Sequence, residues 1–334
     1  MGKKIVLGLD WGTSYIKGVV TRHMPTYVEV LDFFNFKNGK PEEVMKNLDE
    51  KLKLKFSHCV SNLSGKNVLV RYIQFPNMTD EETRAALSVE YTKHLPFEQN
   101  EEVYIDFQRL FYPKNLGDKK LQELPNLLLI GVKKSVIEDF LSKFTVPKYY
   151  PDIIDCDVFA TGNVFTYFNL FSEDKAVAII NIGYSKTTVN IFLGSYSVFS
   201  REFYTAGEQI IEAISKKLVC DMQMAQSAKE AFKDEDKKAI LEAIAKPLSD
   251  IVSEIELSFD YFETRFDKSI EEVVFSGGEL IHPEIQQLLA EKLGKKISED
   301  NLIDKLVISN ELKEKFKKEI PLYFVALGLS LRIE

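Results

Sequence analysis

Apolar and β-branched residues alternate at two places in the chain, as expected for strands joined by tight turns. Near the N-terminus, residues 3–10 and 15–21 predict two strands around a turn at 11–14. A second set begins about half a chain later and is predicted at 176–183, 187–193 and 197–203. Each set opens a segment that mixes strands and helices, so the pattern predicts an α/β protein whose architecture occurs twice.

The stretch from 76 to 149 has a helix-and-strand pattern of its own, and a strand at 66–75 leads into it. Thr79 and Glu82 have the spacing of a capping box, so a helix is expected from there to about His94. Further elements are predicted as strands 103–110 and 127–132 and a helix at 135–144. The pattern therefore predicts that this stretch forms a compact α+β unit.

The second half of the chain is richer in helix. A short strand ending at Asp155 leads into a helix to about 168, and a mostly helical region runs from Thr205 to about 266. The last predicted elements are a strand at 272–275 and helices at 283–293 and 321–331.

Composition narrows the class of protein. Apolar residues make up 45% and charged residues 28% of the chain, as in soluble globular proteins. No stretch approaches the roughly 18 apolar residues of a membrane-spanning helix, so no direct membrane insertion is expected. The net charge of −8 argues against a nucleic-acid partner, because phosphate backbones attract clustered Lys and Arg. Three widely spaced cysteines fit a reducing cytoplasm.

The two predicted turns carry related residues. The first reads Asp10-Trp11-Gly12-Thr13-Ser14, and the second reads Asn181-Ile182-Gly183-Tyr184-Ser185. Several backbone N–H groups at such a hairpin tip can point to one side and form an anion-binding concavity, which glycine lets a phosphate approach closely. Either turn alone is ordinary hairpin chemistry, but two tips facing each other can hold a nucleotide from both sides.

Side chains beside the first turn fit the same interpretation. Thr13 and Ser14 add hydroxyl donors, and Lys17 can neutralise phosphate charge. Asp10 cannot favour phosphate directly, but it suits a hydrated Mg²⁺, which prefers carboxylate and water ligands. Asp10 is therefore expected to reach this metal through water.

Other candidates each have a structural alternative. Gly277 and Gly278 follow a strand, so they can approach an adenine ring or its ribose, or form an ordinary strand-to-helix loop. Thr205 and Glu208 have capping-box spacing, which favours a cap over a nucleotide contact. Asp155, at a predicted strand end, can orient a water molecule or cap the next helix.

The order of these features resembles the superfamily of actin, heat-shock-70 proteins and sugar kinases. More narrowly, the chain resembles the PilM family of type IV pilus assembly proteins, relatives of the cell-division protein FtsA. The narrower resemblance rests on the stretches 8–14, 95–98, 103–106, 154–160, 275–278 and 326–332.

The resemblance implies a two-lobed actin-like α/β fold, in which duplicated RNase H-like lobes flank a cleft for ATP and Mg²⁺. An FtsA-type small subdomain is inserted in the first lobe. The implied boundaries are 1–75, 150–174 and 321–334 for the first lobe, 76–149 for the small subdomain, 175–204 and 268–320 for the second lobe, and 205–267 for a helical subdomain over the adenosine.

The resemblance also assigns residues to the cleft. Those expected to bind the nucleotide are Gly12, Thr13, Ser14, Lys17, Gly183, Ser185, Gly207, Glu208, Gln226, Lys229, Gly277 and Gly278. The candidate catalytic residues are Asp10, Asp155 and Asn181. Gln226 replaces the acid of the Ala-Glu-x-x-Lys helix in FtsA-like proteins, which weakens the expected ribose contact. Asn181 stands where the superfamily usually has Asp; an amide keeps the hydrogen-bonding shape without the charge, so slow or absent hydrolysis is expected.

In function, the resemblance implies a cytoplasmic scaffold recruited to the inner-membrane platform of the pilus machine. Its first lobe and 76–149 unit would dock the N-terminal cytoplasmic peptide of a PilN-like membrane protein. The aromatic candidates to line that groove, or to pack the core of the unit, are Phe97, Tyr104, Phe107, Phe111 and Tyr112. The alternatives are a small-molecule kinase, which Asn181 disfavours, a filament-forming division protein, and a member that binds no nucleotide. Self-association as a homo-oligomer stays open.

Overall fold

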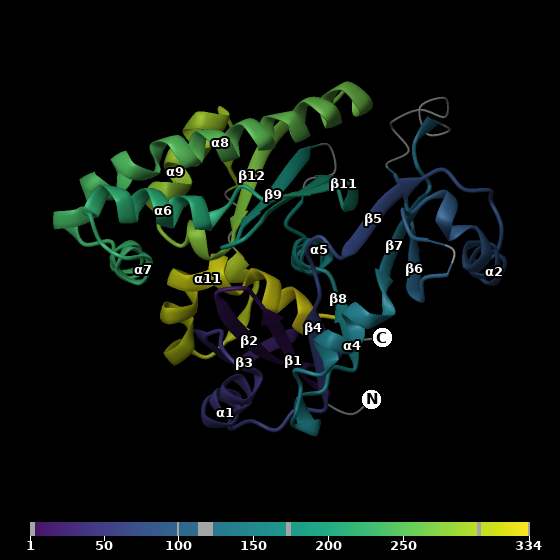
Figure 1. Cartoon of the computed structure of the whole chain (residues 1–334), viewed down its shortest axis with the longest axis horizontal. Coiled ribbons are helices and arrows are strands. Elements are labelled where there is room, and N and C mark those ends of the chain that lie inside the picture. Colours follow the sequence, from purple (N-terminus) through teal and green to yellow (C-terminus); the bar gives the residue numbers. More distant parts are fainter. Residues whose placement is uncertain (1–3, 99, 113–122, 172–174, 299–301, 333–334) are drawn as a thin grey trace.

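The computed structural model of the chain describes residues 4–98, 100–112, 123–171, 175–298 and 302–332. These residues form two large mixed sheets, one above the other in Figure 1, and a small third sheet beside them. Helices cover the outer faces of the large sheets and fill the space between them. The described chain therefore has two lobes and a side unit.

The first large sheet combines an antiparallel meander with parallel strands. Its strands, in spatial order, are β14 (Val307–Ile308), β3 (Val28–Lys37), β2 (Tyr15–His23), β1 (Lys4–Trp11), β4 (His58–Asn62) and β8 (Ile153–Asp155). Strands β1 to β3 pair antiparallel, whereas β4 runs parallel to β1 and β8 parallel to β4. The carboxyl ends of β1, β4 and β8 therefore meet at one edge of the sheet.

The second large sheet repeats this topology. Its strands, in spatial order, are β11 (Tyr196–Phe203), β10 (Thr187–Leu193), β9 (Ala176–Ile182), β12 (Ile270–Ser276) and β13 (Lys296–Ile297). Strands β9 to β11 form the antiparallel meander, and β12 and β13 add in parallel. The recurrence confirms the expected two-lobed, duplicated actin-like fold.

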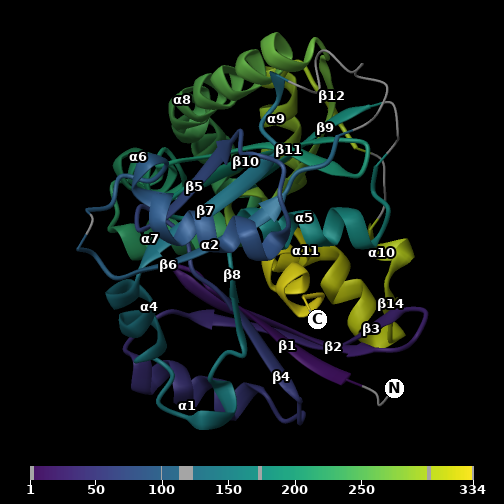
Figure 2. The same cartoon turned by 90° about the vertical axis from the view of Figure 1, so that its right-hand side faces the viewer.

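Helices form three layers around the two sheets (Figures 1 and 2). The outer face of the second sheet packs against α6 (Gly207–Leu218), α8 (Asp234–Phe266) and α9 (Pro283–Leu293). The outer face of the first sheet packs against α1 (Pro41–Lys51) and α4 (Lys134–Leu141). Between the sheets lie α5 (Asp157–Tyr167) and α11 (Asn310–Ser330), whose apolar residues contact both inner faces. Two further helices of the described chain are α7 (Met222–Ala231) and the short α10 (Leu302–Lys305).

The inner helix α11 approaches its neighbours closely at two glycines. A Cβ added to Gly8 of β1 would lie 2.1 Å from the carbonyl oxygen of Ala326. One added to Gly328 would lie 1.8 Å from the carbonyl oxygen of Ala160 in α5. Neither position has room for a side chain, so these glycines allow backbone to pack on backbone.

The same helix begins earlier than the sequence predicts. It starts at Asn310, whereas Pro321 suggested a start at the proline itself. A proline inside a helix removes one hydrogen bond, and here packing on both sides of it compensates. Phe316 and Tyr323 flank the proline, and their rings lie 4.8 and 5.0 Å from that of Phe33.

The small sheet forms the side unit. Its strands, in spatial order, are β5 (Val68–Ile73), β7 (Leu127–Lys133) and β6 (Val103–Arg109), all antiparallel, and α2 (Asp80–Glu90) packs on them. The predicted capping box is confirmed: Thr79 Oγ1 accepts the Glu82 N–H, and the Glu82 carboxylate accepts the Thr79 N–H. Phe97 lies in the core of this unit with Leu87 and Leu129.

The other predicted elements are also present, with small shifts at their ends. The sequence analysis did not predict β3, α1, β4, α10, β13 or β14. Pairing of β14 with β3 places 307–308 in the first sheet, although the sequence assigned 268–320 to the second lobe. A two-residue strand carries no periodicity that could show this. In the part of the chain described, no helix is long and apolar enough to span a membrane.

Candidate functional site

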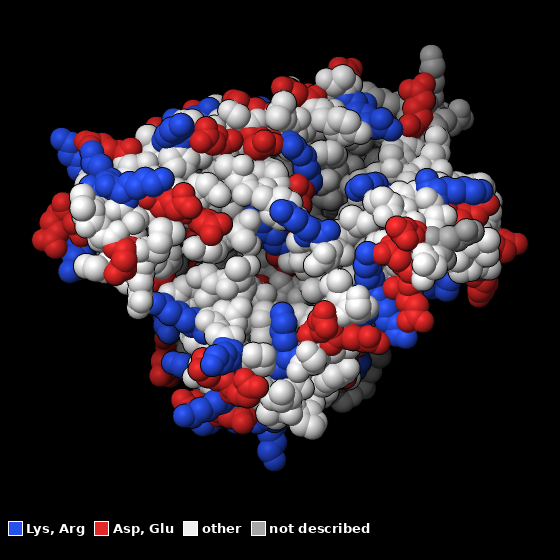
Figure 3. Space-filling model, in the orientation of Figure 1, with Lys and Arg blue, Asp and Glu red and all other residues white. Residues whose placement is uncertain are grey.

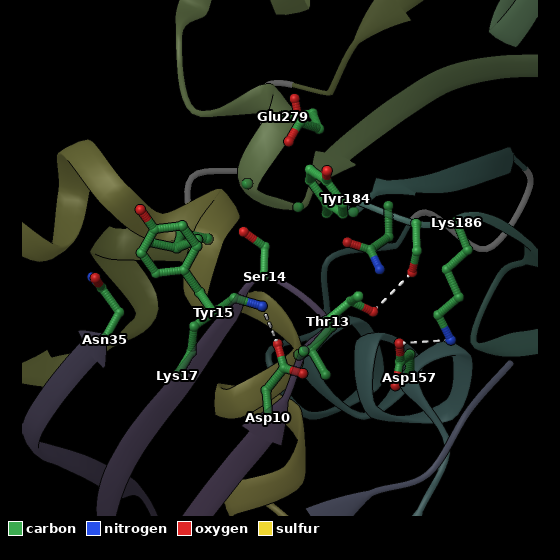
Figure 4. Close-up of a pocket in the computed structure, with 18 of the residues that line it drawn as sticks. Asp10, Thr13, Ser14, Tyr15, Lys17, Asn35, Asp157, Tyr184, Lys186 and Glu279 are labelled. Atoms are coloured by element: carbon green, nitrogen blue, oxygen red, sulfur yellow. Dashed lines mark hydrogen bonds and ion pairs between the residues drawn. The ribbon is translucent and has the colours of Figure 1, made fainter. Parts of the chain in front are cut away.

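The two glycine turns face each other across a cavity of about 260 Å³ between the lobes. The hydroxyls of Thr13 and Ser185 share a hydrogen bond of 2.9 Å across it, drawn in Figure 4. Figure 3 shows the molecule hollowed between the lobes, with both signs of charge interspersed around the opening. Most of the predicted residues line the cavity: Asp10, Gly12, Thr13, Ser14, Lys17, Asn181, Gly183, Ser185, Gln226, Lys229, Gly277 and Gly278.

Glycine is required at two places in the wall. A Cβ on Gly12 would lie 2.6 Å from the carbonyl oxygen of Tyr15, so a side chain there would displace the first turn. Gly277 has a φ of 101°, and a Cβ on it would lie 2.1 Å from the carbonyl oxygen of Ile182. The first turn and the loop at Gly277 therefore keep bare backbone at the cavity surface.

Two carboxylates are joined by an asparagine that the sequence analysis missed. Asn62, at the end of β4, donates from Nδ2 to Asp10 Oδ1 (3.0 Å) and to Asp157 Oδ1 (2.5 Å), while its Oδ1 accepts the Trp11 N–H. The other oxygen of Asp10 lies 2.5 Å from Lys17 Nζ. Both oxygens of Asp10 are therefore hydrogen-bonded. The parallel pairing of β1 with β4 brings Asn62 beside Asp10, and that of β4 with β8 brings Asn62 near Asp157.

A second ion pair, also not predicted, crosses the cleft. Lys186 Nζ lies 3.0 Å from Asp157 Oδ2 and 2.9 Å from Glu202 Oε2. Burial alone would lower the pKa of Lys186, but the charges of Asp157 and Glu202 outweigh it and raise that pKa. Burial would raise the pKa of Asp157, but Lys186 and the Asn62 hydrogen bond hold it below its usual value.

Asp155 does not line the cavity, although the sequence analysis offered it as a catalytic residue. Its Oδ1 accepts the N–H of Cys156, and Oδ2 lies 3.9 Å from Arg332. Burial raises its pKa. It does not cap the following helix either, whose N-cap residue is Cys156. At this strand end, Asp157 is the aspartate that faces the cleft.

The predicted capping box of Thr205 and Glu208 is wrong. Helix α6 begins at Gly207, and the Gln209 side chain accepts the N–H of Ala206. The Glu208 side chain is exposed and does not line the cavity, but the backbone N–H of Glu208 donates to the Tyr184 carbonyl. A Cβ on Gly207 would lie 2.4 Å from Cδ of Glu279, so this glycine makes room for that carboxylate.

A buried ion pair occupies the far end of the cavity. Lys229 Nζ lies 2.5 Å from Glu279 Oε2, and the two side chains are 2% and 4% exposed. Gln226 donates to Glu230, while its own Oε1 is buried and has no hydrogen-bond partner among the described residues. Sequence reasoning missed Glu279, whose only signal was its place after Gly277 and Gly278.

Comparison with known proteins assigns the chain to a family. Residues 29–334 match the family model of the type IV pilus assembly protein PilM. The chain belongs to the PilM family. Among solved structures it is similar to a PilM–PilN type IV pilus biogenesis complex, with a TM-score of 0.83, 22% identity and 98% of each chain covered. It is also similar to the ethanolamine utilization protein EutJ from Carboxydothermus hydrogenoformans, with a TM-score of 0.55, 9% identity, and 99% and 90% covered.

The mouth of the cleft in this PilM-family chain is bridged by a tyrosine. Tyr15, just after the first turn, donates from its hydroxyl to Glu230 Oε1 on α7 (2.7 Å). Burial and the Glu230 carboxylate raise the pKa of Tyr15, so its hydroxyl stays a donor at neutral pH. This contact joins the lobes, as do the hydrogen bond of Thr13 to Ser185 and the ion pair of Lys186 with Asp157.

Asn181 is anchored within its own lobe. Its Oδ1 accepts a hydrogen bond from Ser276 Oγ (3.1 Å), and its side chain is buried. This contact orients the amide at the cavity wall. A carboxylate at the same position could accept the same hydrogen bond.

Proposed function

We propose that this PilM-family chain is an ATP-binding scaffold of type IV pilus assembly. It works at the cytoplasmic face of the inner membrane and docks the N-terminal peptide of a PilN-like protein there. The observation that carries this proposal is the pair of glycine turns from two repeated lobes, which meet across one cavity with Thr13 and Ser185 in hydrogen-bond contact.

The residues around the cavity fit ATP. Gly12 leaves backbone uncovered for phosphate, and Lys17 supplies a positive charge beside it. At the other end of the cavity, Gly277 and Gly278 also leave backbone uncovered, and an adenosine would lie there. Ligand pockets span roughly 300–1,000 Å³, so the cavity of about 260 Å³ is expected to widen when ATP binds, and the Thr13–Ser185 contact to open with it.

The cavity also fits Mg²⁺ held largely by water and phosphate. In the described residues, no group of three or more His, Cys, Asp or Glu is arranged to hold a metal. Both oxygens of Asp10 accept hydrogen bonds, which suits an outer contact through water. The metal would neutralise phosphate charge.

ATP binding is expected to be detectable through Trp11, the chain's single tryptophan. This residue lies in the cavity wall, with its ring 4.9 Å from that of Phe144. Its fluorescence should change as Mg-ATP is added, and calorimetry should give a matching Kd. No heat at millimolar Mg-ATP, together with no co-purifying nucleotide, would refute ATP binding.

Hydrolysis is expected to be slow because Asn181 lacks a charge. A general base or water-orienting group contributes about 10²–10⁴ to rate. Asn181→Asp keeps the Ser276 hydrogen bond and should raise turnover about tenfold or more, with ATP affinity nearly unchanged. The measurement is phosphate release under saturating Mg-ATP. A wild-type rate of one per second or faster would contradict this expectation and favour a kinase.

The docking unit is proposed to be 76–149 with the adjoining first lobe. Strand β6 lies at the edge of the small sheet and pairs only with β7 among the described strands, so its other side can add an extended peptide. Tyr104 on β6 is 52% exposed and lines a hollow of about 370 Å³ with Tyr91 and Phe107. Phe97, in contrast, packs in the core, and Tyr112 packs against Phe266 of α8.

A labelled N-terminal peptide of the PilN-like protein is expected to bind the wild-type chain. Tyr104→Ala should weaken that binding about tenfold, because it removes an apolar contact at the open edge. Tyr27→Ala is the matched control, since Tyr27 is 41% exposed on the loop between β2 and β3. Fluorescence anisotropy with and without Mg-ATP measures both affinities. No binding in either state would refute peptide docking.

A further inference from the structure

One lysine in the cavity wall links the two lobes through their carboxylates. Lys186 follows Ser185 directly, and its carbonyl accepts the Gly183 N–H, which fixes its place in the second turn. Its ammonium reaches across the cleft to Asp157 of the first lobe and back to Glu202 of the second (Figure 4 draws the first contact). The side chain is 12% exposed, so this contact is largely shielded from water.

Each carboxylate oxygen of Asp157 already has a donor. Asn62 donates to its Oδ1, and Lys186 donates to its Oδ2. The other charged groups around it are Lys17 and Asp10 of the first turn, Asp155 on its own segment, and Glu202 beyond Lys186. Among these charged groups, only Lys186 contacts Asp157 directly. Lys186 is therefore the group that keeps the Asp157 carboxylate ionised and in an ion pair.

This matters because Asp157 begins α5 and faces the cavity between the two turns. Hydrolysis would form a bond from a water oxygen to the terminal phosphorus and break the bond from that phosphorus to the bridging oxygen. The products are ADP and inorganic phosphate. The water proton needs an acceptor, and a carboxylate accepts it less readily when an adjacent ammonium stabilises its negative charge.

We propose that Lys186 is a positioning residue that suppresses hydrolysis by holding Asp157 across the cleft. The proposal rests on the ATP binding proposed above, and it adds a second cause of slow turnover to the missing charge at Asn181. Removing the ammonium frees Oδ2 of Asp157 and lets it accept a proton from water.

The test uses the full-length chain and Lys186→Met, which keeps an unbranched apolar stem without the charge. Phosphate release in single turnovers at saturating Mg-ATP is expected to be about tenfold faster than in wild type. The rate should rise with pH and then level off, because Asp157 without Lys186 takes up a proton more readily. The double variant Lys186→Met with Asp157→Asn should lose the acceleration, since its basis is the freed carboxylate. The matched control is Lys217→Met, whose partner Glu242 lies on the outer helix layer.

A second readout needs no ATP. The depressed pKa of Asp157 stabilises the wild-type fold at neutral pH, and that contribution is lost as pH falls through the folded pKa. The Lys186→Met variant lacks this contribution to stability. The difference in unfolding free energy between wild type and variant should therefore shrink from pH 7 to pH 3. Urea unfolding by circular dichroism measures this difference and also reports whether the variant folds.

The outcomes separate the two proposals. If wild type binds no Mg-ATP, the proposed function fails, whatever the urea experiment gives. If ATP binds but Lys186→Met is no faster, the inference is overturned. If the variant also binds ATP at least tenfold more weakly, Lys186 is a phosphate ligand instead. A stability difference that does not depend on pH overturns the pairing with Asp157 even when the variant is too unstable for kinetics.

Discussion

Gly12→Val is expected to weaken ATP binding by roughly 100-fold or more. A Cβ at this position would lie 2.6 Å from a backbone carbonyl, so the first turn has to move before any phosphate reaches its N–H groups. Overpacking of this kind costs about 1–3 kcal/mol, and the lost backbone contacts add to it. Titration of Trp11 fluorescence with Mg-ATP, checked by calorimetry, measures the change.

Two other glycines make this prediction specific. A Cβ on Gly39 would meet only the flexible carboxylate of Glu43, at 2.9 Å, so Gly39→Val should leave the Kd unchanged. In the second turn, a Cβ on Gly183 would lie 3.3 Å from the Lys186 carbonyl, so Gly183→Ala should have an intermediate effect. If Gly12→Val bound ATP within threefold of wild type while remaining folded, phosphate would not lie at the first turn.

Lys229→Met is expected to destabilise the fold by about 3–5 kcal/mol. The change leaves the Glu279 carboxylate 4% exposed and without its partner, packed against Gly207. The free energy of unfolding, from urea titration at pH 7, measures the loss. Replacing both partners, as Lys229→Met with Glu279→Leu, should recover much of it, because no charge then stays buried.

The matched control is Lys237→Met, which breaks an ion pair with Glu284 of the same 2.5 Å length. The two side chains of that pair are 32% and 43% exposed, so water screens it and the unfolding free energy should change far less. Equal losses in the two variants would show that burial does not set the strength of the Lys229–Glu279 pair.

Local signals were sufficient to predict much of the fold. The turns at Gly12 and Gly183 each join two β-branched strands, and their recurrence predicted the duplication. The capping box at Thr79 and Glu82 is a contact between residues three apart, so the sequence shows it directly. Such features depend on neighbours in the chain and on little else.

The features that the sequence did not show come from distant pairings. Asn62 meets Asp10 because β4 runs parallel to β1, across a separation of 52 residues. Lys186 meets Asp157 because the turn between β9 and β10 faces the start of α5 across the cleft. Asp155 and Asp157 are both acids at one strand end, and only the path of the chain into α5 decides which of them faces the cavity.

The position of α11 between the sheets has a consequence for synthesis on the ribosome. β1 and β2 leave the ribosome early, but the helix that covers their inner face at Gly8 is made after every other described element. At roughly 5–20 residues per second, the first hairpin waits tens of seconds with that face uncovered. The first lobe is therefore expected to complete its folding only after translation, and a nascent chain that stalls before 310 should be a substrate for chaperones.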